Sequence, residues 1–259
     1  MKAFKLLAFV PFLCLFASCE KVIEVNVKNS QPTIVIVGEI TDWSGPYTVQ
    51  LSRSVQLEDT IANPPVSALV YVTELGGLTD TFRAIGNGIY QSKFLQGKVG
   101  NTYILHVVAD GKEYISSSTM PAIVTFQSLT IVGQAFFKDS SFYPQVQYLD
   151  PANVSNYYRF VEYKNDSLVK ASFSRSDKFS DGKLNQVLLR NGDYKVNKGD
   201  KVMVDMQCLD EGAYNYFSTL GNANGSSNSA APADPNSNIS GGALGYFSAH
   251  TSAIRAVVR

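Results

Sequence analysis

Few side chains of this sequence could do acid–base or metal chemistry, and they lie far apart. His106 and His250 are the only histidines among the 259 residues. His106 lies within an apolar run, which favours a structural role over a catalytic one. A zinc site needs several His or Cys ligands, and no nucleophile elbow, phosphate loop or His-Glu-x-x-His pattern occurs. We therefore predict no catalytic residues, no metal and no cofactor, and we expect a protein that is not an enzyme.

Oxygen ligands leave one further possibility for a metal. Asp177, Ser180 and Asp181 come just before Gly182, and Ca²⁺ binds through oxygens alone. The segment lacks the further ligands and the late glutamate of an EF-hand loop. A solvated turn is therefore the favoured interpretation, and a calcium site is the alternative.

The leader of the chain indicates export. Two lysines at positions 2 and 5 precede an apolar run over residues 6–16, and Ala17, Ser18 and Cys19 follow. This order is typical of a bacterial signal peptide, and the run is too short to span a bilayer as a stable helix.

A cysteine directly after two small residues resembles the lipobox of a bacterial lipoprotein, where the thiol receives a diacylglycerol and the new amine an acyl chain such as palmitate. We predict a signal peptide over residues 1–18, lipidation of Cys19 and a tether over residues 19–31. The alternative is an ordinary secretory signal in which Cys19 is incidental.

The remaining cysteine is Cys208. It has no partner for an intramolecular disulfide, and it shares a strand face with Val202, Val204 and Met206. This pattern predicts a buried apolar side chain. Removal of Lys2 and Lys5 leaves 20 basic residues (22 minus 2) against 22 acidic ones. Because nucleic-acid binding needs clustered Lys and Arg, we predict no nucleic-acid partner.

An alternation of apolar and polar residues with period two dominates after Gln31 and predicts an all-β fold. Asp110-Gly111 is a strong hairpin turn signal. The strands expected up to Met120-Pro121 are 33–40, 47–51, 68–75, 79–85, 89–90, 102–109 and 112–118. Short strands at this spacing indicate an immunoglobulin-like or prealbumin-like β-sandwich over residues 32–121.

A second β-rich domain with one short helix is expected over residues 122–259. Asp210 could cap the helix, Ala213, Phe217 and Leu220 form its apolar stripe, and Gly221 could end it. The Gly-, Asn- and Ser-rich segment 221–242 predicts a long loop. The expected strands are 128–134, 143–149, 157–164, 168–174, 186–190, 201–209 and a last one within 243–258.

Four blocks of residues resemble a family of Bacteroidota outer-membrane lipoproteins that is known as domain of unknown function 4249. The blocks are Gly45-Pro46-Tyr47-Thr48-Val49 with Leu51-Ser52-Arg53-Ser54, Asn63-Pro64-Pro65-Val66-Ser67-Ala68, Gly88-Ile89-Tyr90 with residues 99–103 and 110–114, and the run from Ser237 to Ala249. The resemblance implies an envelope lipoprotein that faces outward from the outer membrane, with the periplasmic side as the alternative. It also implies a possible TonB-dependent transporter as partner, and no site residue apart from Cys19.

The Gly-rich segment before Tyr246-Phe247 is the candidate contact surface, with Asn238, Tyr246 and Phe247 as its weak binding candidates. The favoured alternative is that both aromatic residues belong to the core of the last strand. Asp59-Thr60-Ile61 and Asp166-Ser167-Leu168 resemble O-glycosylation acceptors of exported Bacteroidota proteins, which makes Thr60 and Ser167 candidates for modification.

Three functions remain open from the sequence. The first is a non-enzymatic surface lipoprotein that acts as an accessory or binding module beside an outer-membrane transporter, anchored to the membrane by its N-terminal lipid. The second is a glycan-binding or adhesive lipoprotein that acts alone. The third is a hydrolase with an unrecognised carboxylate pair, which we rank last.

Overall fold

The computed structural model describes residues 32–55, 65–136, 139–190, 195–223 and 234–259. The predicted signal peptide, the tether, Cys19 and Thr60 lie outside the described residues, so these predictions are not tested by the structure. The described residues belong to one compact unit that runs from Pro32 to Arg259.

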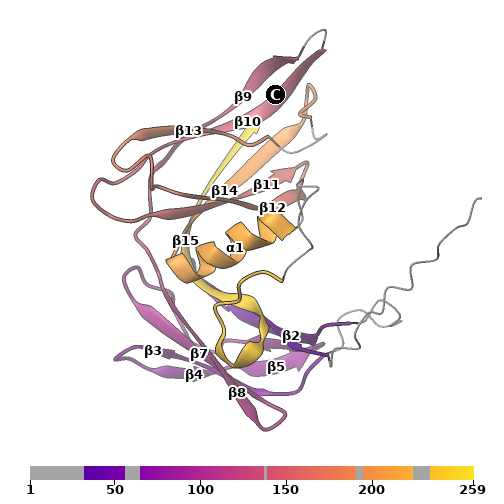
Figure 1. Ribbon diagram of the computed structural model, residues 1–259, viewed down its shortest axis with the longest axis vertical. Coiled ribbons are helices and arrows are strands. Elements are labelled where there is room, and N and C mark those ends of the chain that lie inside the picture. The colour runs from indigo at the N-terminus through magenta and orange to yellow at the C-terminus, as the bar shows by residue number, and fades with distance from the viewer. Residues whose placement is uncertain (1–31, 56–64, 137–138, 191–194, 224–233) are drawn as a thin grey trace, which may run out of the picture. The chain divides into compact units, whose positions relative to one another are not determined.

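The described chain is built almost entirely from strands (Figure 1). In chain order the elements are β1 (Ile34–Thr41), β2 (Thr48–Arg53), β3 (Leu69–Glu74), β4 (Thr79–Thr81), β5 (Arg83–Gly86), β6 (Ile89–Gln91), β7 (Thr102–Ala109), β8 (Lys112–Thr119), β9 (Phe126–Phe136), β10 (Asp139–Leu149), β11 (Tyr157–Lys164), β12 (Ser167–Ser176), β13 (Leu184–Leu188), β14 (Lys201–Leu209), α1 (Glu211–Ala223), the 3₁₀ helix η1 (Ser240–Gly242) and β15 (Leu244–Val258).

One sheet of eight strands passes through both halves of the chain, in the order β12-β11-β14-β15-β1-β2-β6-β5. Its central strand, β15, changes partner along its length. Residues 244–250 pair in parallel with β1, and residues 251–258 pair antiparallel with β14. Figure 1 shows β15, in yellow, running from the β2–β8 group to the β9–β14 group. The last strand of the sequence therefore joins the two halves.

Two smaller sheets cover one face of the large sheet. The four-stranded sheet β4-β3-β7-β8 encloses a core with β1, β2 and the first half of β15, and Phe247 and Ala249 of β15 belong to it. The three-stranded sheet β13-β10-β9 encloses a second core with β11 and β14, which includes Cys208. Because side chains alternate along a strand, odd-numbered residues of β15 face these two cores.

Helix α1 packs on the opposite face of the large sheet. Ala213 and Phe217 form a third apolar cluster with Leu209 and Tyr246. The Asp210 carboxylate accepts a hydrogen bond from the Ala213 N–H at 2.8 Å, which confirms the predicted cap. The helix continues to Ala223 and so passes the predicted end at Gly221.

The all-β fold, the N-terminal sandwich and the single helix agree with the sequence predictions. The strands predicted over 157–164 and 201–209 have the observed bounds. Asp110 and Gly111 both have positive φ angles, 53° and 73°, as the predicted hairpin turn requires.

Two strand predictions need correction. The predicted strand 79–85 is two strands in different sheets, because the chain crosses between the sheets at Phe82, whose ring is buried in the sandwich core. The strand predicted over 186–190 is β13, which spans Leu184–Leu188. Its register follows from pairing with β10, which local sequence does not reveal.

The predicted division at residues 121 and 122 crosses the large sheet. The first region needs residues 244–250 to complete its sandwich. Of the predicted loop 221–242, residues 221–223 extend α1 and residues 240–242 form η1. Residues 224–233 lie outside the described residues.

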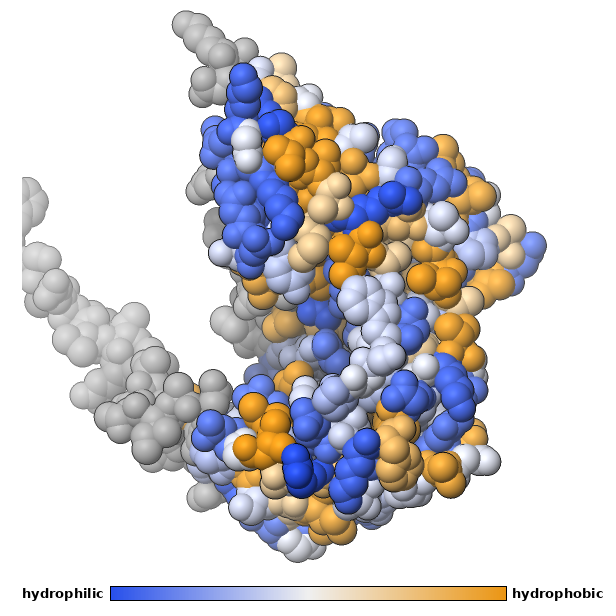
Figure 2. Space-filling view, turned by 180° about the vertical axis from the view of Figure 1, so that it is seen from behind, coloured by the Kyte–Doolittle hydropathy of each residue, from blue (hydrophilic) through white to orange (hydrophobic). Residues whose placement is uncertain are grey.

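The surface carries both apolar and polar side chains. Figure 2 shows apolar residues in separate patches among polar ones on the face turned away from the viewer of Figure 1. Scattered exposed apolar residues are normal for a protein surface. Among the described residues, no helix has the length and apolar character that a membrane-spanning helix needs.

Candidate functional site

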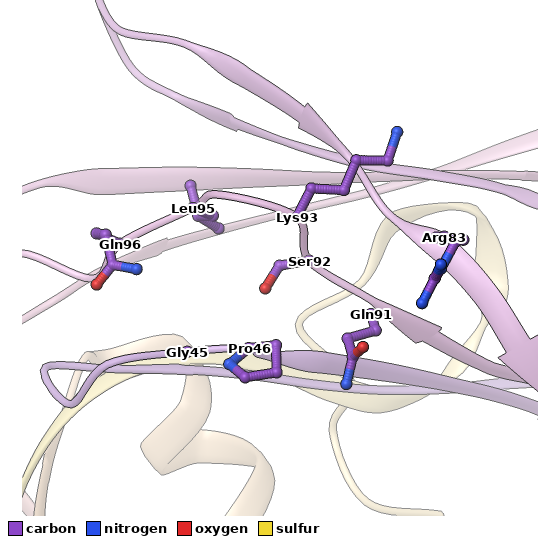
Figure 3. A pocket seen from close by; sticks show the side chains of 8 residues that line it. All are labelled: Gly45, Pro46, Arg83, Gln91, Ser92, Lys93, Leu95 and Gln96. Carbon is purple, nitrogen blue, oxygen red and sulfur yellow. The ribbon is translucent and has the colours of Figure 1, made fainter.

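A pocket of about 520 Å³ opens at one end of the β2–β6–β5 part of the large sheet (Figure 3). It lies in the size range of small-molecule sites. Polar and apolar surface contribute about equally to its lining, which comes from Gly45-Pro46, from Arg83 and from residues 91–96. The lining residues are Gly45, Pro46, Arg83, Gln91, Ser92, Lys93, Leu95 and Gln96.

Strand pairing brings the polar side chains of this pocket together. Gln91 at the end of β6 pairs with Thr48 of β2 on one side and with Arg83 of β5 on the other. Residues paired directly across strands lie on the same face, so Arg83 and Gln91 are neighbours. Lys93 follows Gln91 two positions later. In Figure 3, Gln91 and Ser92 reach toward Pro46, whereas Lys93 extends away from it.

The loop that carries Ser92 and Lys93 is held by a buried carboxylate. One oxygen of Asp80 accepts hydrogen bonds from the backbone N–H groups of Lys93, Phe94 and Leu95 at 2.8–2.9 Å. Asp80 is fully buried. Hydrogen bonds to a charged acceptor are stronger than neutral ones, so Asp80 fixes the shape of this wall.

Tyr47 also holds this loop in place, through hydrogen bonds to Ser92 and Gly97. Its backbone N–H donates to Ser92 Oγ at 2.8 Å, and its hydroxyl accepts from the Gly97 N–H at 2.8 Å. The hydroxyl also donates to the carbonyl oxygen of Trp43 at 2.6 Å. The pocket is therefore shaped before any ligand enters.

The lining carries two positive charges and no carboxylate. Arg83 and Lys93 are exposed, and no described residue forms an ion pair with either side chain. The Asp80 carboxylate is buried behind the loop and bonded to the backbone. The pocket therefore favours a negatively charged group over a cation.

A second group of polar residues lies on the helix-side face, where β15 changes partner. The Arg159 guanidinium donates to Gln207 at 3.1 Å and to Glu39 at 3.5 Å, and it lies 3.8 Å from the centre of the Phe217 ring. Glu39 also accepts from the Tyr246 hydroxyl at 2.7 Å. Arg159 thus joins both halves of the sheet to α1.

The pKa values of His250 and Glu39, which lie in this cluster, are shifted. Burial lowers the pKa of His250, although Glu39 and Asp205 oppose that shift. Burial raises the pKa of Glu39, but attraction to His250 and Arg159 and the hydrogen bond from Tyr246 outweigh it and leave the pKa low. Arg159 carries a permanent charge 3.5 Å from Glu39 and so stabilises its carboxylate form. Neither His250 nor Glu39 lines a described pocket.

The acidic segment noted in the sequence meets a third carboxylate. Asp150, Asp177 and Asp181 place carboxylate oxygens within 4.8 Å of one another. Each already accepts a hydrogen bond from the protein. Asp150 bonds to the Tyr158 hydroxyl and the Gly182 N–H, Asp177 to the Asn156 N–H and Asp181 to the Asn153 N–H. These bonds account for the folded loop, and calcium binding stays the alternative to the predicted solvated turn.

The structure buries Tyr246 and Phe247, as the favoured interpretation of the sequence expected, and leaves Asn238 half-buried. Phe247 is fully buried in the sandwich core and Tyr246 lies under α1. The Asn238 side chain accepts from the N–H of Phe247 and donates to its carbonyl oxygen, at 3.0 and 2.7 Å. Asn238 therefore anchors the start of β15, and neither ring can serve as an exposed anchor.

The other residues singled out in the sequence have simple surroundings. His106 Nδ1 lies 2.9 Å from Glu113 Oε1, and its ring stacks on Tyr71 with centroids 4.6 Å apart. These contacts support the structural role predicted for it. Cys208 is buried, and burial raises the pKa of its thiol. Ser167 is exposed at the start of β12.

A family model described as domain of unknown function (DUF4249) matches residues 20–255. The chain belongs to this family. A comparison with curated proteins finds no match. The DUF4249 match covers both halves of the large sheet, and therefore also the pocket and the Arg159 cluster.

Sequence reasoning missed the pocket of this DUF4249 protein. Arg83 was expected inside one continuous strand, and Lys93 lay between two predicted strands without any motif. Only the pairing of β5 with β6 makes Arg83 a neighbour of Gln91. A usable signal was Asp80, because an aspartate at a core-facing strand position must find backbone or cationic partners.

Proposed function

We propose that this protein is a non-enzymatic, lipid-anchored envelope protein that binds a ligand as an accessory of a TonB-dependent outer-membrane transporter. The observation that carries the binding role is the preformed polar pocket between Pro46 and Arg83. Its lining contains hydrogen-bond donors and cations but neither a histidine nor a cysteine. Such a lining suits recognition better than acyl transfer or acid–base chemistry.

The proposed lipid anchor and transporter partner are supported by the sequence and not by the pocket. Cys19 follows Ala17 and Ser18 after an apolar run, and the resemblance to Bacteroidota outer-membrane lipoproteins supports the location. A diacylglycerol with a further acyl chain supplies many buried methylenes at about 0.8 kcal/mol each, which is enough for stable anchoring. The lipid would hold the pocket close to a transporter in the plane of the membrane.

Replacement of the proposed lipidated cysteine tests the anchor. We expect Cys19→Ser to abolish incorporation of a labelled palmitate and to remove the protein from the membrane fraction. Cys14→Ser, in the same leader, is the matched control and should change neither readout. A Cys19→Ser protein that stays in membranes with its label would refute the anchor.

Purification of the native protein from detergent-treated membranes tests the partner. We expect a TonB-dependent transporter to co-purify with the wild-type protein and not with Cys19→Ser. Repeated failure to recover a transporter would contradict the accessory role. If the wild-type protein then bound carbohydrates on a glycan array, the alternative function of a glycan-binding lipoprotein that acts alone would replace it.

A further inference from the structure

We propose that the pocket between Gly45-Pro46 and the segment 83–96 binds an oxyanion, a carboxylate or a phosphate, carried by a small polar ligand. The proposal deepens the binding role given above and rests on it. No residue of the pocket was singled out by the sequence as a ligand contact.

Charge is the first argument. Arg83 and Lys93 both line the pocket, and no described residue neutralises either side chain. The whole chain has as many acidic as basic residues. The net positive charge of the pocket lining therefore differs from the zero net charge of the chain. Water solvates both exposed cations, and a bound anion beside Arg83 would be attracted by both charges.

The donor geometry is the second argument. Arg83 presents a planar fork of N–H groups, which suits two oxygens of one carboxylate or phosphate. Its strand neighbour Gln91 adds an amide with two further donors. Lys93 adds a positive charge on the loop side, and its ammonium extends away from Pro46 (Figure 3). Arg83 and Gln91 can therefore hold an oxyanion from the sheet side, with Lys93 contributing charge at longer range.

The preformed loop is the third argument. Asp80 and Tyr47 fix the backbone from Ser92 to Gly97 with hydrogen bonds of 2.8–2.9 Å. The Asp80 carboxylate lies behind the loop, where it accepts hydrogen bonds from three backbone N–H groups and forms no ion pair with a described residue. A fixed wall lowers the entropy cost of ligand binding.

The lining also argues against other ligand classes. It contains no aromatic ring, so a neutral sugar finds no surface on which to stack. Its wholly apolar side chains are Pro46 and Leu95, so an apolar ligand would also have to lie against the polar side chains of the lining. The remaining specificity must come from hydrogen bonds and charge.

The test uses the full lipoprotein, purified from membranes in detergent, and calorimetry with three probes. Galacturonate and galactose differ in a single carboxylate, and inorganic phosphate represents the second oxyanion. We expect galacturonate or phosphate to bind saturably and galactose to bind at least about tenfold more weakly. Added salt should weaken the anion binding.

Variants assign the binding to the pocket. Arg83→Gln should weaken anion binding by about tenfold or more, and Lys93→Gln by a few-fold. Arg83→Lys, which keeps the charge and loses the fork, should fall between wild type and Arg83→Gln. Lys198→Gln, at an exposed lysine outside the pocket, is the control and should leave binding unchanged.

Several results would overturn the proposal. Equal binding of galactose and galacturonate would remove the role of the charge, and an unchanged affinity in Arg83→Gln would remove this pocket. Failure of both anions to bind, while a transporter still co-purifies, would refute the oxyanion site and leave the proposed function standing. If the protein binds anions through Arg83 but carries no lipid and recovers no transporter, the oxyanion site would stand and the proposed function would be refuted.

Discussion

His250 is fully buried on the helix-side face of β15, next to Ser248 and within the fields of Glu39, Asp205 and Arg159. Burial lowers its pKa below the 6.5 of an unfolded chain. At a pH between the lowered pKa of folded His250 and the pKa of about 6.5 in the unfolded chain, the unfolded state binds more protons than the folded state. The free energy of unfolding must therefore fall as the pH drops below about 6.5.

A His250→Gln substitution tests this linkage. We expect wild-type stability to fall by up to about 1.4 kcal/mol per pH unit below about pH 6.5, and the variant to lack that slope. Urea unfolding between about pH 7.5 and about pH 5.5 measures it. Ser167→Ala, at an exposed position that carries no titratable group, is the control and should keep the wild-type slope. An unchanged slope in His250→Gln would mean that another group carries the pH dependence.

The buried Asp80 carboxylate should contribute strongly to the stability of the fold. Its carboxylate binds three backbone N–H groups in the interior. We expect Asp80→Asn to lower the free energy of unfolding by about 2–3 kcal/mol, since charge-assisted bonds become neutral and a buried donor is introduced. Asp166→Asn removes an exposed carboxylate that pairs with Lys201 at 3.0 Å. It should cost under about 1 kcal/mol. Equal losses in the two variants would contradict the role given to Asp80.

The contact between β1 and β15 depends on a glycine. Gly245 has a φ angle of +92°, and a Cβ atom there would lie 2.0 Å from the carbonyl oxygen of Ile36. We expect Gly245→Ala to cost more than about 4 kcal/mol or to prevent folding, because the clash is with backbone in the parallel ladder.

Gly242 provides the matched control for that substitution. Its φ angle is also positive, at +78°, but no atom lies within 4 Å of an added Cβ. Gly242→Ala should therefore cost only about 1–2 kcal/mol, the strain of a left-handed alanine. Urea unfolding of both variants separates steric clash from backbone strain. Similar losses would show that the approach of β15 to β1 is not tight.

At the scale of the whole molecule, the shared sheet predicts cooperative unfolding. β15 supplies Phe247 and Ala249 to one core and pairs with β14 above the other. Loss of either half therefore exposes apolar surface of the other. We expect fluorescence of Trp43, the only tryptophan, and far-UV circular dichroism to give coincident transitions. Two separate transitions would contradict this view.

A fragment tests the same point and the predicted domain division. Residues 32–121 alone lack the strand that pairs with β1 on the side away from β2. We expect this fragment to show no cooperative transition in urea. The chain from residue 32 to 259 is the positive control. A folded fragment would instead establish residues 32–121 as an independent domain, with β15 as an addition to its edge.

Local pattern was enough for much of the fold. The period of two in residues 157–164 and 201–209 predicted two strands with their observed bounds, because one or both faces of each are buried. Asp110-Gly111 and Asp210 gave a turn and a helix start through short-range backbone chemistry. The export leader and the lipid on Cys19 are likewise predictions of sequence, and they await their own test.

Tertiary structure decided which elements meet. Alternation tells which face a side chain takes but not which strand lies beside it, so the sequence could not show that β15 pairs with β1 across more than two hundred residues. In β15, Tyr246 lies under α1 and Phe247 lies in the sandwich core, which decides between the core and the contact-surface interpretations of these residues. The pairing of β5 with β6 likewise sets Arg83 beside Gln91. The candidate site arises from non-local strand pairing. A local sequence motif therefore could not predict it.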